Sequence, residues 1–367
     1  MEPFKNLISE KTAYLLSQNI KRHYKSFNEK EFNKNIKQEL APLELKDRVK
    51  FLSKKLHDYL PDDFKEAAPI LLGVVNDQEK QSTLSGFDVW PLTEYVASYG
   101  LDQFEISMNL LKEMTKIFTS EFAVRSFFIK HQDHTLKMFK KWIKDENEHV
   151  RRLVSEGSRP LLPWGQKLPG LIEEPNLTME LLEKLKNDKS LYVRKSVANH
   201  LNDHSKNHPD LVVKTLEVWK KEDPNNKNIE WIIRHASRTL VKKAHPKALA
   251  LHGVTNAKIK VSKIKLKKTA IELNESLMVT IRIENTSKKD AFVIIDSDID
   301  FLKANGSHLT KCFKGKKITL RSQEARVLEI KIPIKKVTTR KYYEGTHYVS
   351  LKINGKNEKR IQFFLKC

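Results

Sequence analysis

The sequence predicts a chain in two parts, a stack of α-helices up to about residue 250 and an all-β sandwich over residues 258–367. Two observations lead to this prediction. Apolar residues recur every three or four positions in the first part, as in helices, and every second position in the last part, as in strands. At 367 residues the chain is long enough for two or three domains, each with its own hydrophobic core.

Helical spacing begins in the amino-terminal region, where Val49, Leu52, Leu56 and Leu60 would share one helix face. Prolines punctuate the pattern as far as Pro246 and mark where helices stop or start. We expect residues 1–100 to form a helical cap on the structure that follows, and the sequence assigns no chemistry to them.

An internal repeat defines the central region. Three segments align with one another: 145-DENEHVRRLVSEG, 188-DKSLYVRKSVANH and 228-NIEWIIRHASRTL. Each places Asp or Asn five residues before a β-branched residue, and Arg follows that residue directly. A shortened copy, 119-TSEFAVRSFFIKH, precedes them. The spacing is close to the roughly 40–47 residues of a HEAT or armadillo repeat. Residues 101–252 are therefore predicted to form a HEAT-like α-solenoid, in which one helix of each pair lines a groove.

Strand signals begin abruptly after the glycine at position 253. Alternating segments include 258-KIKVSKIKL, 277-LMVTIRIEN, 326-RVLEIKIPI and 349-VSLKI, and Asn354-Gly355 before 359-KRIQFF indicates a hairpin. About seven such runs predict an immunoglobulin-like β-sandwich. Many of these sandwiches carry Gly-x-Tyr-x-Val before the hairpin, and here Gly345, His347 and Val349 occupy those places.

The net charge of +22 indicates a polyanionic partner. Residues 258–367 hold 26 Lys and Arg against 11 Asp and Glu, while the rest of the chain holds 42 against 35. Most of the excess therefore lies in the predicted sandwich, where 263-KIKLKK and 311-KCFKGKK are candidate phosphate contacts. A basic surface that serves only solubility is the alternative.

Neither a metal nor a cofactor is indicated. The two cysteines lie far apart without CxxC spacing, and the 13 histidines show no ligand pattern. The sequence also shows no membrane span and no secretory leader, so we expect a cytoplasmic protein with no membrane partner.

The segment 150-VRRLVSEGSRPLLPWG contains the main candidate site. On a helical projection Val150, Leu153, Val154 and Gly157 share one side. Arg152, Glu156 and Arg159 share the opposite side and are predicted to point away from the core. Gly157 weakens a helix by up to about 1 kcal/mol against alanine, so we expect close packing against a neighbouring helix there.

Two interpretations of this segment compete. In the first, the three charges form an ordinary exposed ion-pair set and Trp164 is a core residue in a loop. In the second, Glu156 lies between two guanidinium groups on a concave face beside the Trp164 ring. Such a site would suit a cation stacked on the indole and phosphates held by the arginines.

The repeat register extends this candidate surface. Lys195 and Asn199 take the places of Arg152 and Glu156 in the next copy. Asp203 lies near the end of that helix, where a turn residue is the alternative, and Glu121 is placed in the first helical turn of the preceding copy. The last copy adds three further basic or aromatic candidates, Arg234, Arg238 and Trp231, the last of which is as consistent with a core residue.

The segments SEFAVRSF, HVRRLVSEGSRPLLPW and VRKSVANHLND resemble those of the HEAT-repeat DNA alkylation repair glycosylases, specifically the AlkC branch. The resemblance covers residues 1–250. Some members of the branch also carry a carboxy-terminal immunoglobulin-like domain. The family implies hydrolysis of the N-glycosidic bond of cationic N3-alkylated bases, 3-methyladenine and 3-methylcytosine, in double-stranded DNA.

The resemblance also implies roles for the candidate residues. Glu156 is the first choice for a catalytic carboxylate, followed by Asp203 and Glu121, one of which would orient the water. Trp164 would contact the lesion or its sugar. Arg152 and Arg159 would hold flanking phosphates, and the other contacts to the DNA backbone would come from Lys195, Arg234 and Arg238.

We expect a monomer that acts on alkylated duplex DNA and associates with the nucleoid when bound, its β-sandwich acting as a second clamp on the DNA. Two alternatives are a HEAT-repeat scaffold that binds another protein, and a DNA-binding protein that recognises damage without cutting. Neither alternative would release a free base.

Overall fold

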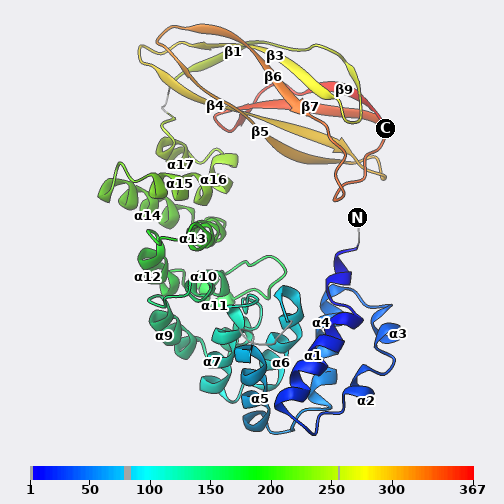
Figure 1. The fold of residues 1–367 in the computed structure, drawn as a ribbon. Helices are drawn as coiled ribbons and strands as arrows, with labels where there is room; N and C mark the ends of the chain where they lie inside the picture. Colours follow the sequence, from blue (N-terminus) through cyan, green and yellow to red (C-terminus); the bar gives the residue numbers. More distant parts are fainter. Residues whose placement is uncertain (1–2, 78–83, 255–256) are drawn as a thin grey trace. The chain divides into compact units, whose positions relative to one another are not determined.

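The computed structural model describes residues 3–77, 84–254 and 257–367, which form two compact units (Figure 1). The first unit contains the residues up to His208 together with Asn225–Ala236, and the second contains Pro209–Pro224 together with Ser237–Cys367. Among the described residues, no helix is both long and apolar enough to cross a membrane.

The first unit is entirely helical, as the apolar periodicity predicted. Two short 3₁₀ turns, Phe4–Leu7 and Gly86–Val89, accompany its helices. The helices are α1 (Glu10–His23), α2 (Glu29–Asn33), α3 (Ile36–Leu40), α4 (Leu45–His57), α5 (Phe64–Asn76), α6 (Trp90–Tyr99), α7 (Phe104–Thr115), α8 (Val124–Lys130), α9 (Gln132–Trp142), α10 (Glu148–Gly157), α11 (Pro169–Glu173), α12 (Asn176–Leu185), α13 (Leu191–His204) and α15 (Lys227–Ala236).

The four aligned sequence copies fall on α8, α10, α13 and α15, in that order. Helix α10 packs against α13, and α13 packs against α15. Polar caps start the two central copies, since Asn147 accepts a hydrogen bond from the His149 amide and Ser190 accepts one from the Tyr192 amide. The repeat register therefore brings equivalent positions of neighbouring copies side by side.

The second unit combines three helices with the strands that the structure describes. Its helices are α14 (Pro209–Glu222), α16 (Arg238–Lys242) and α17 (Pro246–Leu251). Its strands are β1 (Ile259–Leu266), β2 (Ala270–Glu272), β3 (Ser276–Asn285), β4 (Ala291–Leu302), β5 (His308–Leu320), β6 (Ala325–Pro333), β7 (Gly345–Ile353), β8 (Lys356–Asn357) and β9 (Ile361–Lys366).

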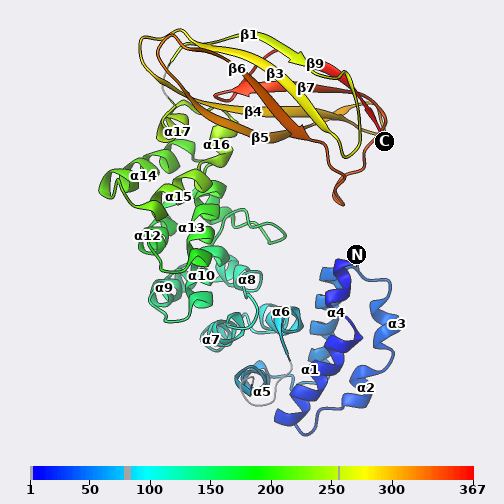
Figure 2. The same ribbon diagram turned by 45° about the horizontal axis from the view of Figure 1, so that its top comes forward.

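The strands form two sheets that face each other across one core (Figure 2). The smaller sheet has the antiparallel order β1-β3-β6, and the larger has the order β2-β9-β7-β4-β5, with β8 paired to β7. Alternate residues of β3 and β7 are buried, which is the period of two seen in the sequence. These features confirm the predicted all-β sandwich.

Two details of the sandwich follow from its sequence. Asn354 and Gly355 have φ angles of 50° and 79°, and both lie in the left-handed region that a tight hairpin turn requires. His347 replaces the expected tyrosine and is fully buried. Its Nδ1 accepts a hydrogen bond from the Leu302 amide, so its Nε2 carries the proton and donates to the Tyr343 carbonyl at 3.0 Å. The histidine thus ties the strand to the chain before it, as a corner tyrosine would.

Candidate active site

Helix α10 holds the central part of the candidate site in a well-packed position. Its Val150, Leu153 and Val154 side chains are buried in the core. A Cβ atom on Gly157 would lie 2.7 Å from Val124 Cγ2 of α8, which confirms the close packing expected at this glycine. After Gly157 the Ser158 hydroxyl donates to the Val154 carbonyl at 2.6 Å and satisfies one acceptor at the helix end.

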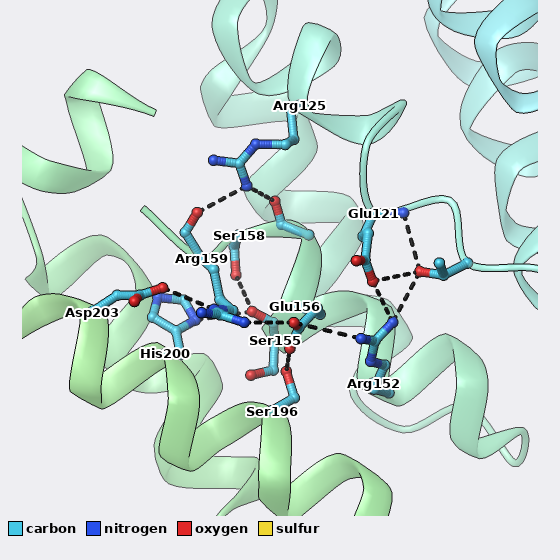
Figure 3. A network of polar contacts seen from close by, with 12 residues as sticks. Glu121, Arg125, Arg152, Ser155, Glu156, Ser158, Arg159, Ser196, His200 and Asp203 are labelled. Atoms are coloured by element: carbon cyan, nitrogen blue, oxygen red, sulfur yellow. Dashed lines mark hydrogen bonds and ion pairs between the residues drawn. The ribbon is translucent and has the colours of Figure 1, made fainter. Parts of the chain in front are cut away.

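Three carboxylates and two guanidinium groups alternate in a row that we call the carboxylate network (Figure 3). Its members, in order, are Glu121, Arg152, Glu156, Arg159 and Asp203. They come from the turn before α8, from α10 and the residues after it, and from the last turn of α13. Three successive sequence copies therefore contribute to one site.

Glu156 is the centre of the network. Its Oε1 accepts from Arg159 Nη1 at 2.6 Å and lies 3.4 Å from Arg152 Nη2. Its Oε2 accepts a hydrogen bond from the Ser196 hydroxyl at 2.6 Å. With 5% of its surface exposed, Glu156 is held as a fully hydrogen-bonded group between α10 and α13.

The two ends of the network differ in how many partners they have. Arg159 Nε donates to Asp203 Oδ2 at 2.8 Å, and Lys206 Nζ donates to Asp203 Oδ1 at 3.0 Å, so both oxygens of this carboxylate are engaged. At the other end Glu121 Oε2 accepts from Arg152 Nη1 and from the Thr119 hydroxyl. Within the described residues, Glu121 Oε1 accepts no hydrogen bond.

The network keeps its two guanidinium groups charged. Burial lowers the pKa of Arg152, but Glu121 and Glu156 outweigh this effect and leave the pKa above its ordinary value. Burial likewise lowers the pKa of Arg159, and Glu156 and Asp203 more than restore it. The Arg152 guanidinium also lies 4.8 Å from the centre of the Tyr192 ring.

Buried histidines lie on α13 next to the network. His200 Nδ1 donates to the Ser155 carbonyl at 2.9 Å, and His204 Nε2 lies 3.1 Å from the Thr178 hydroxyl. Burial, followed by the neighbouring His204, lowers the pKa of His200 well below its usual value. Burial also lowers the pKa of His204 to about 4, so both rings are neutral at neutral pH.

Three structural expectations for these residues are wrong. The charged face of α10 does not point away from the core, because α13 covers it and leaves 5% of Glu156 and 6% of Arg159 exposed. The alternative of an exposed ion-pair set fails for the same reason. Glu121 is not in a first helical turn, since α8 begins only at Val124.

Trp164 is not a core residue, because 60% of its surface is exposed. Its ring meets Phe4 edge-on at 5.9 Å, and its carbonyl accepts a hydrogen bond from Lys46. A role beside Glu156 stays a prediction. Asp203 lies near the end of its helix, as expected, but its side chain is 2% exposed and belongs to the network rather than to a turn.

The remaining predicted contacts are more peripheral. Lys195 is exposed on α13, directly before Ser196. Arg234 is exposed on α15 and lies 3.3 Å from Glu230, and Trp231 is partly buried and stacks on His235. Arg238 lies in α16 of the second unit. DNA-binding roles for the three basic residues stay predictions.

Sequence reasoning missed the residues that fix the network from outside. These are Arg125, Ser196, His200 and Lys206. Lys46 was also missed, and it contacts the Trp164 carbonyl. Only Arg125 carried a signal, because it is the Arg that follows the β-branched residue in the first copy. Ser196, His200 and Lys46 depend on contacts between segments far apart in the sequence, which the pattern of one helix does not reveal, whereas Lys206 lies three residues after its partner Asp203.

The comparisons with known proteins agree with this architecture. Residues 109–240 match a family described as DNA alkylation repair enzyme, and residues 260–367 match the C-terminal Ig-like domain of the uncharacterised protein YhaZ. The chain is 38% identical over 365 residues to the uncharacterised protein YhaZ of Bacillus subtilis (strain 168), with 99% of each chain covered.

A solved structure of a DNA repair enzyme matches the fold of the whole chain. It is the Pseudomonas fluorescens alkylpurine DNA glycosylase AlkC, bound to DNA that contains an abasic site analog. The sequence identity is 35%, the TM-score is 0.88, and the match covers 100% of both chains. The chain therefore belongs to the AlkC branch of the HEAT-like DNA alkylation repair proteins.

Proposed function

We propose that this protein is a DNA glycosylase that hydrolyses the N-glycosidic bond of cationic N3-alkylated bases, 3-methyladenine and 3-methylcytosine, in duplex DNA. The observation that carries the proposal is the buried carboxylate network, in which three acids from three repeats meet around two arginines. The AlkC relative, an alkylpurine DNA glycosylase bound to abasic-site DNA, supports the same reaction.

The chemistry of a cationic base matches a site of this composition. A base that already carries a positive charge leaves readily, so the protein need not supply the general acid of ordinary glycoside hydrolysis. It must stabilise an oxocarbenium-like sugar and position a water for attack. Fixed carboxylates do both, because their negative charge opposes the developing positive charge and their oxygens accept a proton from water.

The hydrogen bonds support a division of these tasks among the three acids. Both oxygens of Glu156 and both oxygens of Asp203 are occupied, so these groups supply fixed negative charge. Glu121 has one oxygen, Oε1, without a hydrogen-bond partner in the part of the chain that the structure describes. We assign to Glu121 the positioning of the water, and to Glu156 and Asp203 the stabilisation of the sugar cation.

The same contacts change the roles expected of the two arginines. Arg152 and Arg159 are committed to carboxylates, and Arg159 is 6% exposed. Their first task is to hold the three carboxylates in a fixed orientation at close range. Phosphate contacts then fall to exposed cations such as Lys195 and Arg234.

Trp164 would provide the contact to the lesion. Its indole is mostly exposed, and an aromatic face attracts a cationic base more strongly than a neutral one. Selectivity for alkylated bases would come from two sources. A neutral base is a poorer leaving group, and it also gains less from the aromatic and acidic surroundings.

The test is the release of free 3-methyladenine and 3-methylcytosine from methylated duplex DNA by the purified full-length chain. We expect Glu121→Gln, Glu156→Gln and Asp203→Asn each to lower the single-turnover rate by about a hundredfold or more. Glu180→Gln is the matched control, because Glu180 lies on α12 in an exposed ion pair with Lys140. Circular dichroism of each variant would show that the fold is kept.

Two outcomes would contradict parts of this proposal. Rates within a few-fold of the wild type for all three variants would exclude the carboxylate assignments. No release of either base by the wild type would exclude the glycosylase. An inactive protein that still bound methylated DNA preferentially would be a damage-recognising protein. An inactive protein without that preference would favour the scaffold.

A further inference from the structure

The segment between α10 and α11, residues 158–168, presents Trp164 in a conformation that needs outside support. Trp164 has a φ of 64°, in the left-handed region that a bulky residue rarely adopts. The Gly165 amide donates to the Leu162 carbonyl at 3.1 Å and closes the turn around it. Because the indole is 60% exposed, burial of its own ring does not hold this conformation.

Arg125 of α8 anchors the segment from the inside. Its guanidinium is fully buried and donates to the carbonyls of Gly157, Arg159 and Gln166. The equivalent arginines of the next two copies, Arg151 and Arg194, donate instead to carbonyls at the start of their own repeats. Arg125 thus occupies a repeated position, but unlike Arg151 and Arg194 it holds the segment that follows α10.

Lys46 of α4 anchors the segment from the other side. Its Nζ donates to the carbonyl of Trp164 itself. The same Nζ lies 5.8 Å from the centre of the Phe122 ring, and Phe122 directly follows Glu121. Lys46 therefore contacts both the segment that carries Trp164 and the turn that carries Glu121.

Aromatic contacts extend the same connection. The Trp164 ring meets Phe4 edge-on, and Phe4 meets Phe87 edge-on at 5.7 Å. Phe87 in turn lies 5.1 Å from Phe118, just before the turn that holds Glu121. Phe4 and Lys46, from the amino-terminal region to which the sequence assigned no chemistry, thus contact the exposed indole and its carbonyl.

We propose that Lys46 is a positioning residue that holds Trp164 in its projecting conformation through the backbone carbonyl, so that the amino-terminal helices take part in lesion recognition. This inference rests on the proposed function, in which Trp164 contacts the base. Lys46 acts through Trp164 and need not touch DNA. An exposed lysine could instead bind a phosphate, and the two roles predict different results.

The experiment combines Lys46→Met, Trp164→Ala and the double variant in the single-turnover release of 3-methyladenine. Lys50→Met is the matched control, because Lys50 is exposed one turn further along α4 and makes no contact with Trp164. We expect Lys46→Met to slow release by roughly tenfold, and Trp164→Ala by as much or more, because misplacement of a contact group lowers the rate steeply. The double variant should be no slower than Trp164→Ala alone, and Lys46→Arg should restore most of the rate.

Salt dependence separates positioning from phosphate binding. A lysine that contacts a phosphate adds about 0.9 to the slope of log K against log salt for duplex DNA. We expect Lys46→Met to leave this slope unchanged. A slope reduced by about one, or losses that multiply in the double variant, would overturn the proposal.

Hydrogen exchange tests the anchor without any activity. In Lys46→Met the amide of Gly165 should exchange about tenfold faster or more, whereas Lys50→Met should leave it as in the wild type. Unchanged exchange in Lys46→Met would overturn the anchor even in an active enzyme. If the Gly165 amide exchanges faster in Lys46→Met but the wild type releases no base, the anchor is supported. Only the proposed function is then excluded.

Discussion

At the scale of single residues, the buried neutral histidines of α13 make the stability of the fold depend on pH. His204 is 1% exposed, and burial lowers its pKa to about 4 from an ordinary 6.5. As the pH falls from 6.5, the unfolded chain takes up a proton on this residue before the folded chain does. The stability that neutral His204 contributes is therefore complete above pH 6.5 and is lost between pH 6.5 and about 4.

We predict that His204→Gln flattens the pH dependence of the unfolding free energy between pH 7 and pH 4.5. A shift of this size corresponds to about 3 kcal/mol over the full window, because each pKa unit is worth about 1.4 kcal/mol. Urea unfolding followed by circular dichroism measures the effect. His134→Gln, at an exposed histidine of α9, is the control and should keep the wild-type slope. Equal slopes for His204→Gln and the wild type would exclude this role.

The candidate site shows what single-residue patterns can and cannot predict. The spacing of Arg152, Glu156 and Arg159 placed them on one helix face, and the repeat register added Asp203 and Glu121. The structure joins all five in one network. Their burial was not predictable from the spacing, because it depends on α13 covering a polar face of α10, and a charged face normally indicates solvent.

At the scale of elements, a buried ion pair ties the two central repeats to each other. Asp188 stands at the start of one copy and Arg151 near the start of the copy before it. Arg151 Nε donates to Asp188 Oδ2 at 2.6 Å and Nη2 donates to Oδ1 at 2.9 Å. The side chains are 8% and 5% exposed. Although burial opposes it, the Arg151 partner leaves the pKa of Asp188 below its usual range.

We predict that Arg151→Met lowers the unfolding free energy of the helical unit by about 3 kcal/mol, because the Asp188 carboxylate would remain buried without its partner. The double variant Arg151→Met/Asp188→Leu should recover much of this loss. The measurement is a double-mutant cycle by urea unfolding. The exposed pair Lys140–Glu180, which also joins neighbouring helices, is the control and should give no measurable coupling. The same coupling energy for both pairs would contradict a larger stabilising role for the buried Arg151–Asp188 pair.

The elements themselves were largely predictable. Helical periodicity and prolines predicted the helices, and alternation with Asn354-Gly355 predicted the strands and a hairpin. Glu121 was misplaced because 119-TSEF resembles a helix start, whereas the chain makes a turn there and α8 begins at Val124. Helix boundaries are set by capping contacts that propensity alone does not determine.

At the scale of the whole molecule, the positive charge is concentrated in the strands of the second unit. Strand β5 lies at the edge of the larger sheet and presents Lys311, Lys314, Lys316 and Lys317 to solvent. Lysines on an edge strand have one general use, which is to prevent pairing with another chain. In a protein proposed to act on duplex DNA, their second use would be as a sequence-independent clamp on phosphates.

Salt dependence distinguishes these two uses. We predict that Lys314→Gln, Lys316→Gln and Lys317→Gln together weaken binding to duplex DNA that carries an abasic-site analog. They should also reduce the slope of log K against log salt by about two or more, because each lost phosphate contact removes about 0.9. The control is the same change at Lys137, Lys141 and Lys144, three exposed lysines on or beside α9. Helix α9 contributes no residue to the carboxylate network.

An unchanged slope in the β5 variant, together with new self-association, would assign the β5 lysines to protection of the sheet edge and would exclude the DNA clamp. A reduced slope in the β5 variant but not in the control would show that the second unit holds DNA through its charge.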